Sequence, residues 1–405
     1  MEEFNIVRLG HHGNGITEGG YYAPLTLPGE IIRGIKNAKS LEQIKIIEPS
    51  SDRVRPPCTH FKTCGGCQLQ HASDEFVSSW KVAIVAQALA AHGILTKLRT
   101  CLTSPIASRR RATFSARRTK KGALAGFHAR GSGVIVKISN CQLLNADLLA
   151  ALPIIEAFAI FGISRKGELR AQVTTSQVGL DIAIEGGKQL DGPMHASLAQ
   201  QTEAYQLARL TWNKEIIAVP HAPSQKFGTA TVFPPPGSFL QATTEGQEDL
   251  LKTVKKILKG AKRVVDLFSG SGTFSLPLAE TAEVHAVEGN KDMMAALDKG
   301  WRHALGLKKV THETRDLICH PLLPDELEKF DAAIIDPPRA GADAQIAALS
   351  KSNIKMIAYV SCNPVSFARD AATLTTNGYD LQFVQTVDQF RWSSHIELVG
   401  SFFKL

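Results

Sequence analysis

The first fifty residues alternate short apolar runs with glycine and polar residues, as in NIVRLGHHGNGI and APLTLPGEIIRGI. Short strands separated by glycine-containing turns are typical of small β-barrels. We therefore expect an OB-like barrel over residues 1–50. Such barrels often carry nucleic acid on one face, although the same pattern fits a β cap on a larger domain.

The middle of the chain changes from helical to strand periodicity. The segment EFVSSWKVAIVAQALAAHG, from Glu75, has helical spacing and is stopped by Gly93. Five later segments have the pattern of short strands between Gly and Ser turns: ATFSARR, ALAGFHAR, VIVKIS, LRAQVTTS and VGLDIAIE. These patterns predict a central α+β domain over residues 51–235.

The most apolar stretch, LLAALPIIEAFAIFGI, begins at Leu148. It contains Pro153 and Glu156 and is shorter than the roughly 20 apolar residues that a membrane span needs. We expect a core helix and no contact with membranes. The N-terminal MEEFNIVRLG is acidic and lacks the basic and apolar regions of a secretory signal, which predicts a cytoplasmic location.

The last part of the chain has the pattern of a parallel sheet. A proline-rich connector, TVFPPPGSFLQAT, precedes it. After the connector, the compact apolar segments RVVDLF, VHAVE, AAIID and MIAYVS are each followed by a loop and helical sequence. We expect a Rossmann-like α/β domain over residues 236–405, so that the whole chain is a multidomain α/β protein.

Composition and charge favour a globular protein that contacts a polyanion. Of 405 residues, 44% are hydrophobic and 21% charged, and the formal net charge is +8. Seven of the thirteen residues in RRRATFSARRTKK, residues 109–121, are cationic, with Phe114 between the two runs and Phe127 close behind. This distribution suits RNA, and it equally suits the solvated edge of a β-hairpin.

A glycine-rich loop, SGSGTFSLPLA, follows the strand RVVDLF and leads into a helix. Such loops let a ligand approach the backbone closely, but alone they are a weak signal. Glu288 ends the next strand, Asp316 falls where a further strand would end, and Asp336 opens DPPR. The order D-x-F-x-G-x-G, E, D, DPP is typical of S-adenosylmethionine methyltransferases rather than dinucleotide dehydrogenases. Asp266 in this series could have a purely structural role.

Two residues near the C-terminus are candidates for catalysis. Cys362 in YVSCNP follows a strand on the same edge as Asp336, and it is either a buried cysteine or a nucleophile. Carbon methylation needs such a thiolate, because addition to C6 of uracil makes C5 nucleophilic, and a base must then remove the C5 proton. Glu397 in FRWSSHIELV is the candidate base, with His395 on the same face of a strand. Glu397 also fits an ordinary surface strand position.

Three cysteines are concentrated in CTHFKTCGGCQLQH, at Cys58, Cys64 and Cys67. Their spacing is compatible with an iron–sulfur cluster or with tetrahedral zinc, although zinc sites usually show paired short spacings. A disulfide is disfavoured in the cytosol.

Taken together, the motifs from Cys58 to Glu397 resemble the uracil-5 RNA methyltransferases, specifically the iron–sulfur branch acting on 23S ribosomal RNA. The resemblance implies that residues 1–50 form a TRAM domain, that Cys362 is the nucleophile and that Glu397 is the base. It implies that Cys141 joins the three clustered cysteines as ligands of a [4Fe-4S] cluster, which we interpret as a structural staple. The residues it implies for the S-adenosylmethionine site are Gln241, Phe268, Thr273, Glu288, Asp316 and Asp336, and Gln241 and Asp336 also reach the uracil.

The sequence departs from the family pattern in a few places. Thr273 and Thr243 each replace an Asn that is common in the family, and WSS before His395 replaces a more histidine-rich stretch. These changes concern the substrate side more than the cofactor side. Cys101 and Cys319 remain as expected packing cysteines.

Three alternatives stay open. The same chemistry could act on the T-loop uridine of tRNA, whose better-known bacterial enzymes lack the cysteine cluster. The chain could be a non-catalytic iron–sulfur RNA-binding or assembly factor, against which the catalytic and cofactor residues argue. Methylation of an amino nitrogen usually needs an aromatic residue where Arg339 stands. We expect a monomer with RNA as its partner.

Overall fold

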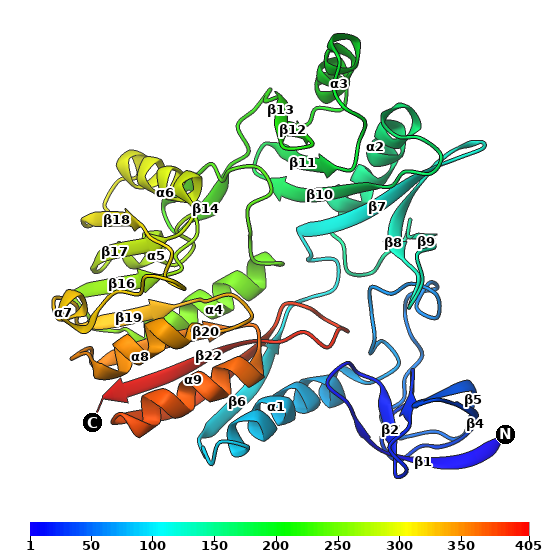
Figure 1. Ribbon diagram of the computed structural model, residues 1–405, viewed down its shortest axis with the longest axis horizontal. Helices are drawn as coiled ribbons and strands as arrows, with labels where there is room; N and C mark the ends of the chain where they lie inside the picture. The colour runs from blue at the N-terminus through cyan, green and yellow to red at the C-terminus, as the bar shows by residue number, and fades with distance from the viewer. Residues whose placement is uncertain (405) are drawn as a thin grey trace.

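In the computed structural model, which describes residues 1–404, the first strands close into a barrel (Figure 1). The barrel order is β1-β2-β3-β5-β4, and side chains such as Ile6, Ile32 and Leu41 fill its core. Alternation of buried and exposed positions along the strands explains why the sequence pattern predicted it. The strands are β1 (Glu2–Leu9), β2 (Gly15–Thr17), β3 (Tyr22–Ala23), β4 (Ile31–Asn37) and β5 (Ser40–Glu48).

The central domain is a seven-stranded sheet in the order β13-β12-β11-β10-β7-β8-β9, backed by helices. Its longest helix, α2, contains the apolar stretch from Leu148 and buries that residue, Ile155 and Phe158 completely, which confirms a core helix. The elements are β7 (Arg111–Thr119), β8 (Gly122–His128), β9 (Ile135–Lys137), α2 (Ala146–Gly162), β10 (Leu169–Ser176), β11 (Gly179–Glu185), α3 (Gly192–Ala204), β12 (Arg209–Trp212) and β13 (Glu215–Ala218).

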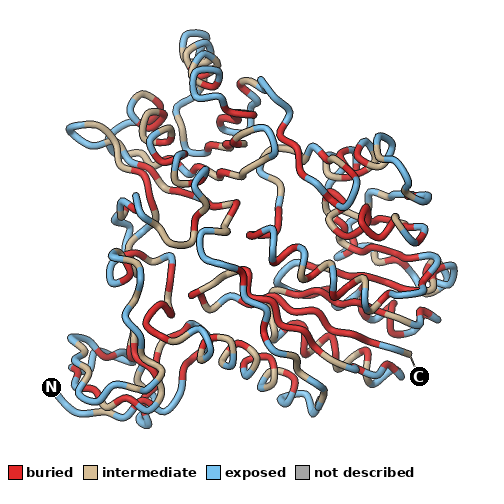
Figure 2. Tube along the Cα trace, turned by 180° about the vertical axis from the view of Figure 1, so that it is seen from behind, coloured by how far each residue is buried: buried red, intermediate tan, exposed pale blue. Residues whose placement is uncertain are grey.

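The C-terminal sheet has eight strands in the order β18-β17-β16-β19-β20-β22-β21-β6. Its inner strands are largely buried, whereas the edge strands β18 and β6 are mostly exposed or half-buried (Figure 2). Helices cover both faces, as in a doubly wound fold. The strands are β6 (Lys97–Thr103), β16 (Arg263–Leu267), β17 (Glu283–Glu288), β18 (Val310–Thr314), β19 (Ala332–Ile335), β20 (Met356–Ser361), β21 (Tyr379–Asp388) and β22 (Glu397–Lys404). The helices are α1 (Asp74–Ala90), α4 (Thr244–Ile257), α5 (Ser275–Leu278), α6 (Lys291–His303), α7 (Pro324–Leu327), α8 (Asp343–Lys351) and α9 (Pro364–Thr376).

The expected domain boundaries need correction at two places. Strand β6 pairs with β21, and helix α1 packs on β6 and α9, so residues 74–103 belong to the C-terminal sheet and not to the central domain. The small hairpin of β14 (Gln225–Phe227) and β15 (Ala230–Val232) also buries its apolar side chains in the C-terminal core. The local pattern of a strand does not reveal its partner, because pairing is decided by burial far along the chain.

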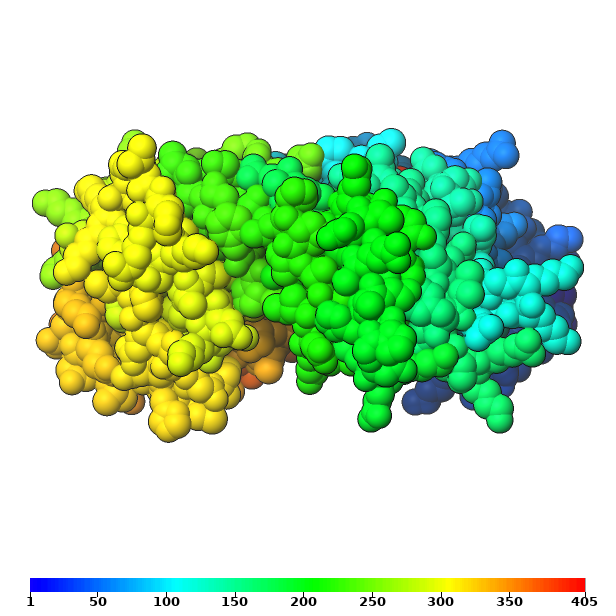
Figure 3. Space-filling view, turned by 90° about the horizontal axis from the view of Figure 1, so that it is seen from above, coloured from blue at the N-terminus to red at the C-terminus, as the bar shows by residue number. Residues whose placement is uncertain are grey.

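The candidate residues lie near strand ends at one edge of the C-terminal sheet. Strands β16 to β20 are mutually parallel, so their carboxyl ends meet there. Strand β22 runs antiparallel to β20 and begins at the same edge with Glu397. Seen from above, a hollow separates the lobe of the C-terminal domain in yellow from the central domain in green (Figure 3). Among residues 1–404, no helix combines the length and apolar character needed to span a bilayer.

Candidate active site

The glycine-rich loop after β16 presents a tight turn beside the acid at the end of β17. Phe268 has a φ of 63° and Gly272 a φ of 94°, and a Cβ on Gly272 would lie 3.0 Å from atoms of Leu276 and Leu297. The amide of Gly270 donates to Glu288 Oε2 at 3.1 Å. This bond fixes the carboxylate of Glu288 next to the loop, where a ribose hydroxyl could reach its other oxygen.

Other residues implied for the cofactor site lie around the same edge. Thr273 is half-buried within the loop, and the exposed Asp316 follows β18 by two residues. The amide of Ile318 donates to Asp316 at 3.0 Å, and this bond lowers the pKa of the carboxyl. Asp316 is therefore ionised and available to accept a hydrogen bond at the far side of the crevice.

Asp266, by contrast, is closed off from any ligand. It is completely buried at the end of β16 and accepts a hydrogen bond of 2.5 Å from the hydroxyl of Ser275 in α5. Burial raises its pKa to about 7. The contact ties the strand to the helix that follows the loop, which supports the structural role for Asp266.

The candidate nucleophile and base lie on neighbouring strands. Ser361 of β20 pairs with Leu398 of the antiparallel strand β22. Cys362 follows Ser361 and Glu397 precedes Leu398, so both lie next to this pair at the same end of the two strands. Cys362 is half-buried, and burial together with the charges of Glu397 and Asp336 raises its pKa to about 11. Glu397 is only 4% exposed, which corrects the alternative of a surface strand position. Burial and the nearby Asp336 hold the pKa of Glu397 well above its usual range.

Asp336 completes the acidic group at this edge. It follows β19, the strand next to β20, and burial raises its pKa to about 7. The loop it opens is bound to the loop of Cys362, because the side-chain amide of Asn363 donates to the carbonyl of Arg339 at 2.8 Å. Ser366 donates to the same carbonyl at 3.1 Å. The guanidinium of Arg339 partly offsets the rise in the pKa of Cys362, because its positive charge favours the thiolate.

Gln241 is held against the base by a residue that the sequence analysis missed. Gln389 donates to Gln241 Oε1 at 2.5 Å and accepts from the amide of Ala242 at 2.7 Å. The same side chain hydrogen-bonds Glu397 and partly offsets the rise in its pKa. Arg110 supports the assembly from the central domain by donating to the carbonyl of Gln241 at 3.1 Å. A buried glutamine has no sequence signature, and only its position eight residues before Glu397 links it to the motif.

The four cysteines implied as cluster ligands line one small cavity between the cysteine-rich segment and the central domain. Trp392 of the C-terminal loop packs beside it in a cluster with Phe61 and Cys67. Burial raises the pKa of Cys67 to about 12, and the other cysteines add to the rise. The amide of Gly66 donates to the sulfur of Cys64 at 3.4 Å. Within residues 1–404 no group of His, Cys, Asp or Glu side chains has the arrangement of a metal-ion site. The all-thiol donor set nevertheless fits a group that binds four thiolates.

Two expectations about individual residues are wrong, and the aromatic residue of the basic stretch lies in the core. Phe114 is completely buried and stacks on Phe127 in the core at 5.3 Å between ring centroids, so it cannot stack on a base. His395 precedes β22 and is exposed while Glu397 is buried, so the two do not share a face. Cys319 is exposed and does not pack, whereas Cys101 is buried as expected. In each case the local pattern hides which side chain the tertiary fold covers.

The basic stretch over residues 109–121 is divided by the fold. Arg110 is 9% exposed and donates to Gln247 Oε1 at 2.7 Å, so it holds the domains together. Arg117, Lys120 and Lys121 are exposed at the β7–β8 hairpin. Arg117 is paired with Glu168 at 2.7 Å, which leaves Lys120 and Lys121 as exposed cations able to contact a polyanion.

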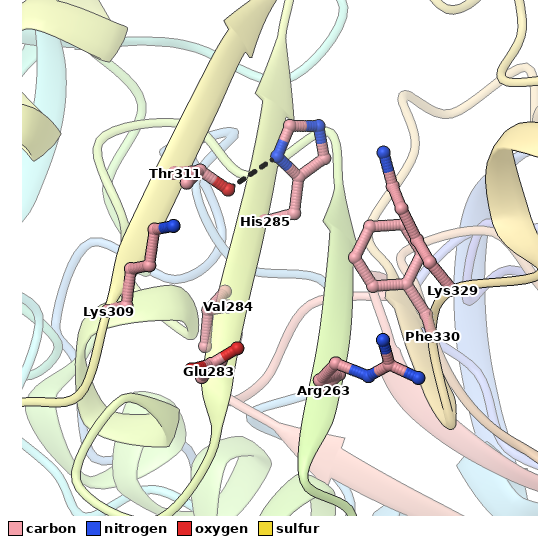
Figure 4. Close-up of a pocket in the computed structure, with 8 residues that line it drawn as sticks. All are labelled: Arg263, Glu283, Val284, His285, Lys309, Thr311, Lys329 and Phe330. Atoms are coloured by element: carbon pink, nitrogen blue, oxygen red, sulfur yellow. Dashed lines mark hydrogen bonds between the residues drawn. The ribbon is translucent and has the colours of Figure 1, made fainter.

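A separate pocket of about 200 Å³ lies at the opposite edge of the C-terminal sheet (Figure 4). Arg263 and Glu283 begin their strands there, and His285 stacks on Phe330 at 5.7 Å between ring centroids. The pocket contains none of the candidate catalytic residues. Ligands of open parallel sheets bind at the carboxyl ends of the strands, so this pocket is not the active site.

Comparisons with known proteins agree with this geometry. A family model described as tRNA (Uracil-5-)-methyltransferase matches residues 324–404. An uncharacterized RNA methyltransferase of Rhizobium meliloti is 42% identical, over 98% of this chain and 98% of its own. The 23S rRNA (uracil(1939)-C(5))-methyltransferase RlmD of Shewanella sp. is 31% identical, over 99% of this chain and 95% of its own.

A solved structure has the same fold over nearly the whole chain. The tRNA (uracil-54, C5)-methyltransferase of Pyrococcus abyssi, in complex with S-adenosyl-L-homocysteine, superposes with a TM-score of 0.76. The match covers 99% of both chains at 21% sequence identity. With the relatives above, it leads to one conclusion: this chain belongs to the RNA uracil-5 methyltransferase family and is an S-adenosylmethionine-dependent enzyme of that class.

Proposed function

We propose that the protein methylates C5 of a uridine in 23S ribosomal RNA through a covalent bond between Cys362 and C6 of the base. The observation that carries the proposal is the placement of Cys362 and Glu397 on paired strands at the edge where the cofactor loop lies. A nitrogen or oxygen methyltransferase would need neither a thiol nor a buried base there.

Formation of the adduct begins with Cys362. Its pKa of about 11 keeps the thiol protonated at neutral pH, so the proton leaves to solvent as the sulfur bonds to C6. The guanidinium of Arg339 assists because it favours the negatively charged sulfur. The electron pair of the C5–C6 double bond moves onto C5 and O4, and C5 becomes the nucleophile.

S-adenosylmethionine, when bound, supplies an electrophilic methyl group to C5. We assign its binding to Phe268, Thr273, Glu288 and Asp316 around the glycine-rich loop, with Gln241 and Asp336 between cofactor and uracil. The positive sulfonium favours the ionised forms of Asp336 and Glu397, whose pKa values are raised in the free protein. Cofactor binding thus favours the carboxylate form of Glu397 before transfer. When the methyl group passes to C5, the cofactor sulfur keeps the electron pair of the broken bond and loses its charge, so this carboxylate is a stronger base at the last step.

Release of the product requires Glu397. As a carboxylate it takes the proton from C5, the electron pair restores the C5–C6 double bond, and the sulfur leaves C6. A carboxylate whose pKa is raised is a stronger base than an exposed one, which suits removal of a carbon-bound proton. Gln389 holds the Glu397 side chain in place by its hydrogen bond.

For the four-cysteine cavity, formed by Cys58, Cys64, Cys67 and Cys141, we propose a [4Fe-4S] cluster with a structural role. The support is the donor chemistry: four thiols and no other titratable side chain line one cavity. Optical and Mössbauer spectra of anaerobically purified protein test the assignment. A colourless protein would contradict it if it held one equivalent of tightly bound zinc and the zinc-edge X-ray absorption spectrum showed four sulfur ligands.

The relatives support a ribosomal RNA target. The full-length match to RlmD favours 23S rRNA, and the exposed cations of the β7–β8 hairpin supply phosphate contacts. We assign the N-terminal barrel to the TRAM type and expect it to share this contact. A monomer in the cytoplasm suffices for the reaction.

Mapping the modified nucleotide tests the target. Total RNA from a strain lacking the gene is incubated with the enzyme and S-adenosylmethionine carrying a labelled methyl group. We expect labelled 5-methyluridine in one oligonucleotide of 23S rRNA. Label in the T-loop of tRNA instead would assign the chain to the other branch, and label on a nitrogen would contradict the proposal.

A further inference from the structure

The cysteine loop, residues 58–71, is bonded directly to the catalytic loop, residues 389–396, which precedes the base. The amides of Gln68 and Leu69 both donate to the carbonyl of Trp392, at 2.8 and 3.0 Å. These are the two residues that follow Cys67. The backbone that follows Cys67 is therefore hydrogen-bonded to the backbone that leads to Glu397.

The side chain of Trp392 strengthens this link. It is 6% exposed and packs in one small apolar cluster with Phe61 and Cys67, with Cys58 at its margin. Trp392 has a φ of 60°, a conformation that costs a side-chain-bearing residue on the order of 1 kcal/mol or more. Such a backbone persists only where its surroundings hold it, and here the surroundings are the cysteine loop.

A second connection fixes the ends of the catalytic loop. Lys81 of α1 is completely buried, forms an ion pair with Asp388 at 2.7 Å and donates to the carbonyl of His395 at 2.8 Å. The helix of Lys81 begins three residues after the cysteine loop. With both ends held and Trp392 docked, the loop has little freedom of its own.

The catalytic loop also carries the partner of the base. Gln389 is its first residue and bonds Gln241, the amide of Ala242 and Glu397. A displacement at Trp392 would therefore move Gln389 and Glu397 together, because Gln389 is the first residue of this eight-residue loop and Glu397 directly follows its last.

We propose that Trp392 is a positioning residue for the base, and that filling of the four-cysteine cavity sets the position of Glu397 through it. This inference rests on the function proposed above and gives the cysteine cavity a role beyond stability: the loss of its ligand disturbs proton removal at C5 rather than attack at C6.

Hydrogen exchange measures the link without reference to activity. Exchange is followed in three forms: the wild-type protein with metal bound in the four-cysteine cavity (the loaded form), the wild-type protein freed of metal by chelation, and loaded Trp392→Ala. We expect exchange of residues 389–397 to accelerate at least about 10-fold in both altered forms. Residues 263–290, which carry the glycine-rich loop, should keep their protection. Unchanged exchange of residues 389–397 in both altered forms would overturn the inference.

The chemical consequence separates positioning from stability. If Glu397 is displaced, loaded Trp392→Ala should still attack uridine RNA and transfer the methyl group, but release should slow. The methylated covalent complex should accumulate at least about 10-fold over wild type, because proton removal contributes roughly 10² or more to the rate. Trp392→Phe, which keeps an aromatic ring against Cys67, should restore release.

Trp212→Phe is the matched control. Trp212 is also buried, but it lies in the core of the central domain, where its ring meets that of Phe158 and its Nε1 donates to the carbonyl of Lys188. The Trp212→Phe protein should have a lower melting temperature than wild type but should not accumulate the methylated covalent complex. Accumulation in this control, or none in Trp392→Ala, would overturn the positioning role. If no variant forms any complex, the covalent function itself fails, while the exchange experiment still decides whether the two loops are linked.

Discussion

Three acidic or potentially acidic groups share the small space around the reacting base. Burial raises the pKa of all three groups, Cys362, Asp336 and Glu397; in addition, Asp336 disfavours ionisation of Glu397, and both carboxyl groups disfavour ionisation of Cys362. Perturbed pKa values of this kind cluster at functional sites, because the environment that harms stability also tunes reactivity. Arg339 supplies the positive charge that offsets this repulsion at the thiol.

Replacement of the nucleophile should separate chemistry from cofactor binding. We expect Cys362→Ala to lose methylation by at least about 10³-fold, because no other side chain can activate C5. Its affinity for S-adenosylmethionine, measured by calorimetry, should stay within about 2-fold of wild type. Cys101→Ala, at a buried cysteine outside the site, serves as the control and should retain activity. A Cys362→Ala protein that no longer binds the cofactor would argue for a structural cysteine.

Replacement of the base should stop the reaction at a later point. Glu397→Gln preserves the shape of the side chain but cannot accept the C5 proton, so we expect turnover to fall by about 10² to 10⁴. The methylated adduct should then persist and be visible as a band of RNA-linked protein in a denaturing gel. If Glu397→Gln forms no adduct with ordinary uridine RNA but binds it normally, another residue removes the proton.

Asp336 offers a test through pH-dependent stability. Its pKa rises from 3.8 to about 7 on folding, so between these values the folded chain keeps a proton that the unfolded chain releases. The carboxyl therefore destabilises the fold increasingly as the pH rises through this window, and fully above it. Asp336→Asn should raise the melting temperature near pH 8 and change it little near pH 4. A shift of equal size at both pH values would show that ionisation is not the cause.

Sequence motifs predicted the placement of the candidate catalytic residues better than that of the side chains around them. Cys362, Glu397 and Asp336 lie at one strand edge, as a parallel sheet requires. Gln389 and Trp392 escaped prediction because their importance comes from contacts with distant segments and not from a local pattern. His395 was placed wrongly because the strand begins only at Glu397, so alternation does not extend to it.

At the scale of elements, two segments from the first quarter of the chain complete the catalytic sheet. Strand β6 adds the last strand and α1 covers part of its face. Helices and parallel strands were predictable from their periodicity, since burial on both faces leaves a compact apolar run. The pairing of β6 with β21 was not, because nothing local distinguishes the partner of an edge strand.

The buried ion pair between α1 and β21 should dominate the attachment of that helix. Lys81→Met leaves Asp388 buried without a partner, and we expect a loss of about 3–5 kcal/mol in the free energy of unfolding. The double variant with Asp388→Asn should recover part of this loss, because no unpaired charge remains. Lys252→Met, in an exposed pair with Glu248, should change the free energy by less than about 0.5 kcal/mol. Urea unfolding curves give all three values, and equal effects of the buried and exposed lysines would contradict the argument.

At the scale of the whole molecule, the barrel, the central sheet and the catalytic sheet meet around the two loops that carry the cysteines and the base (Figure 1). The three-part architecture was predictable from changes in periodicity along the chain. The junction itself was not, because it joins residues more than three hundred positions apart.

The central claim is that Cys362 bonds covalently to a uridine of ribosomal RNA. The most direct test incubates anaerobically purified enzyme and S-adenosylmethionine with cellular RNA that contains 5-fluorouridine, whose fluorine cannot leave as a proton. We expect a stable complex with a 23S rRNA sequence attached to Cys362, and no such complex with Cys362→Ala. No complex from an enzyme that binds both cofactor and RNA, or a complex that persists in Cys362→Ala, would contradict it.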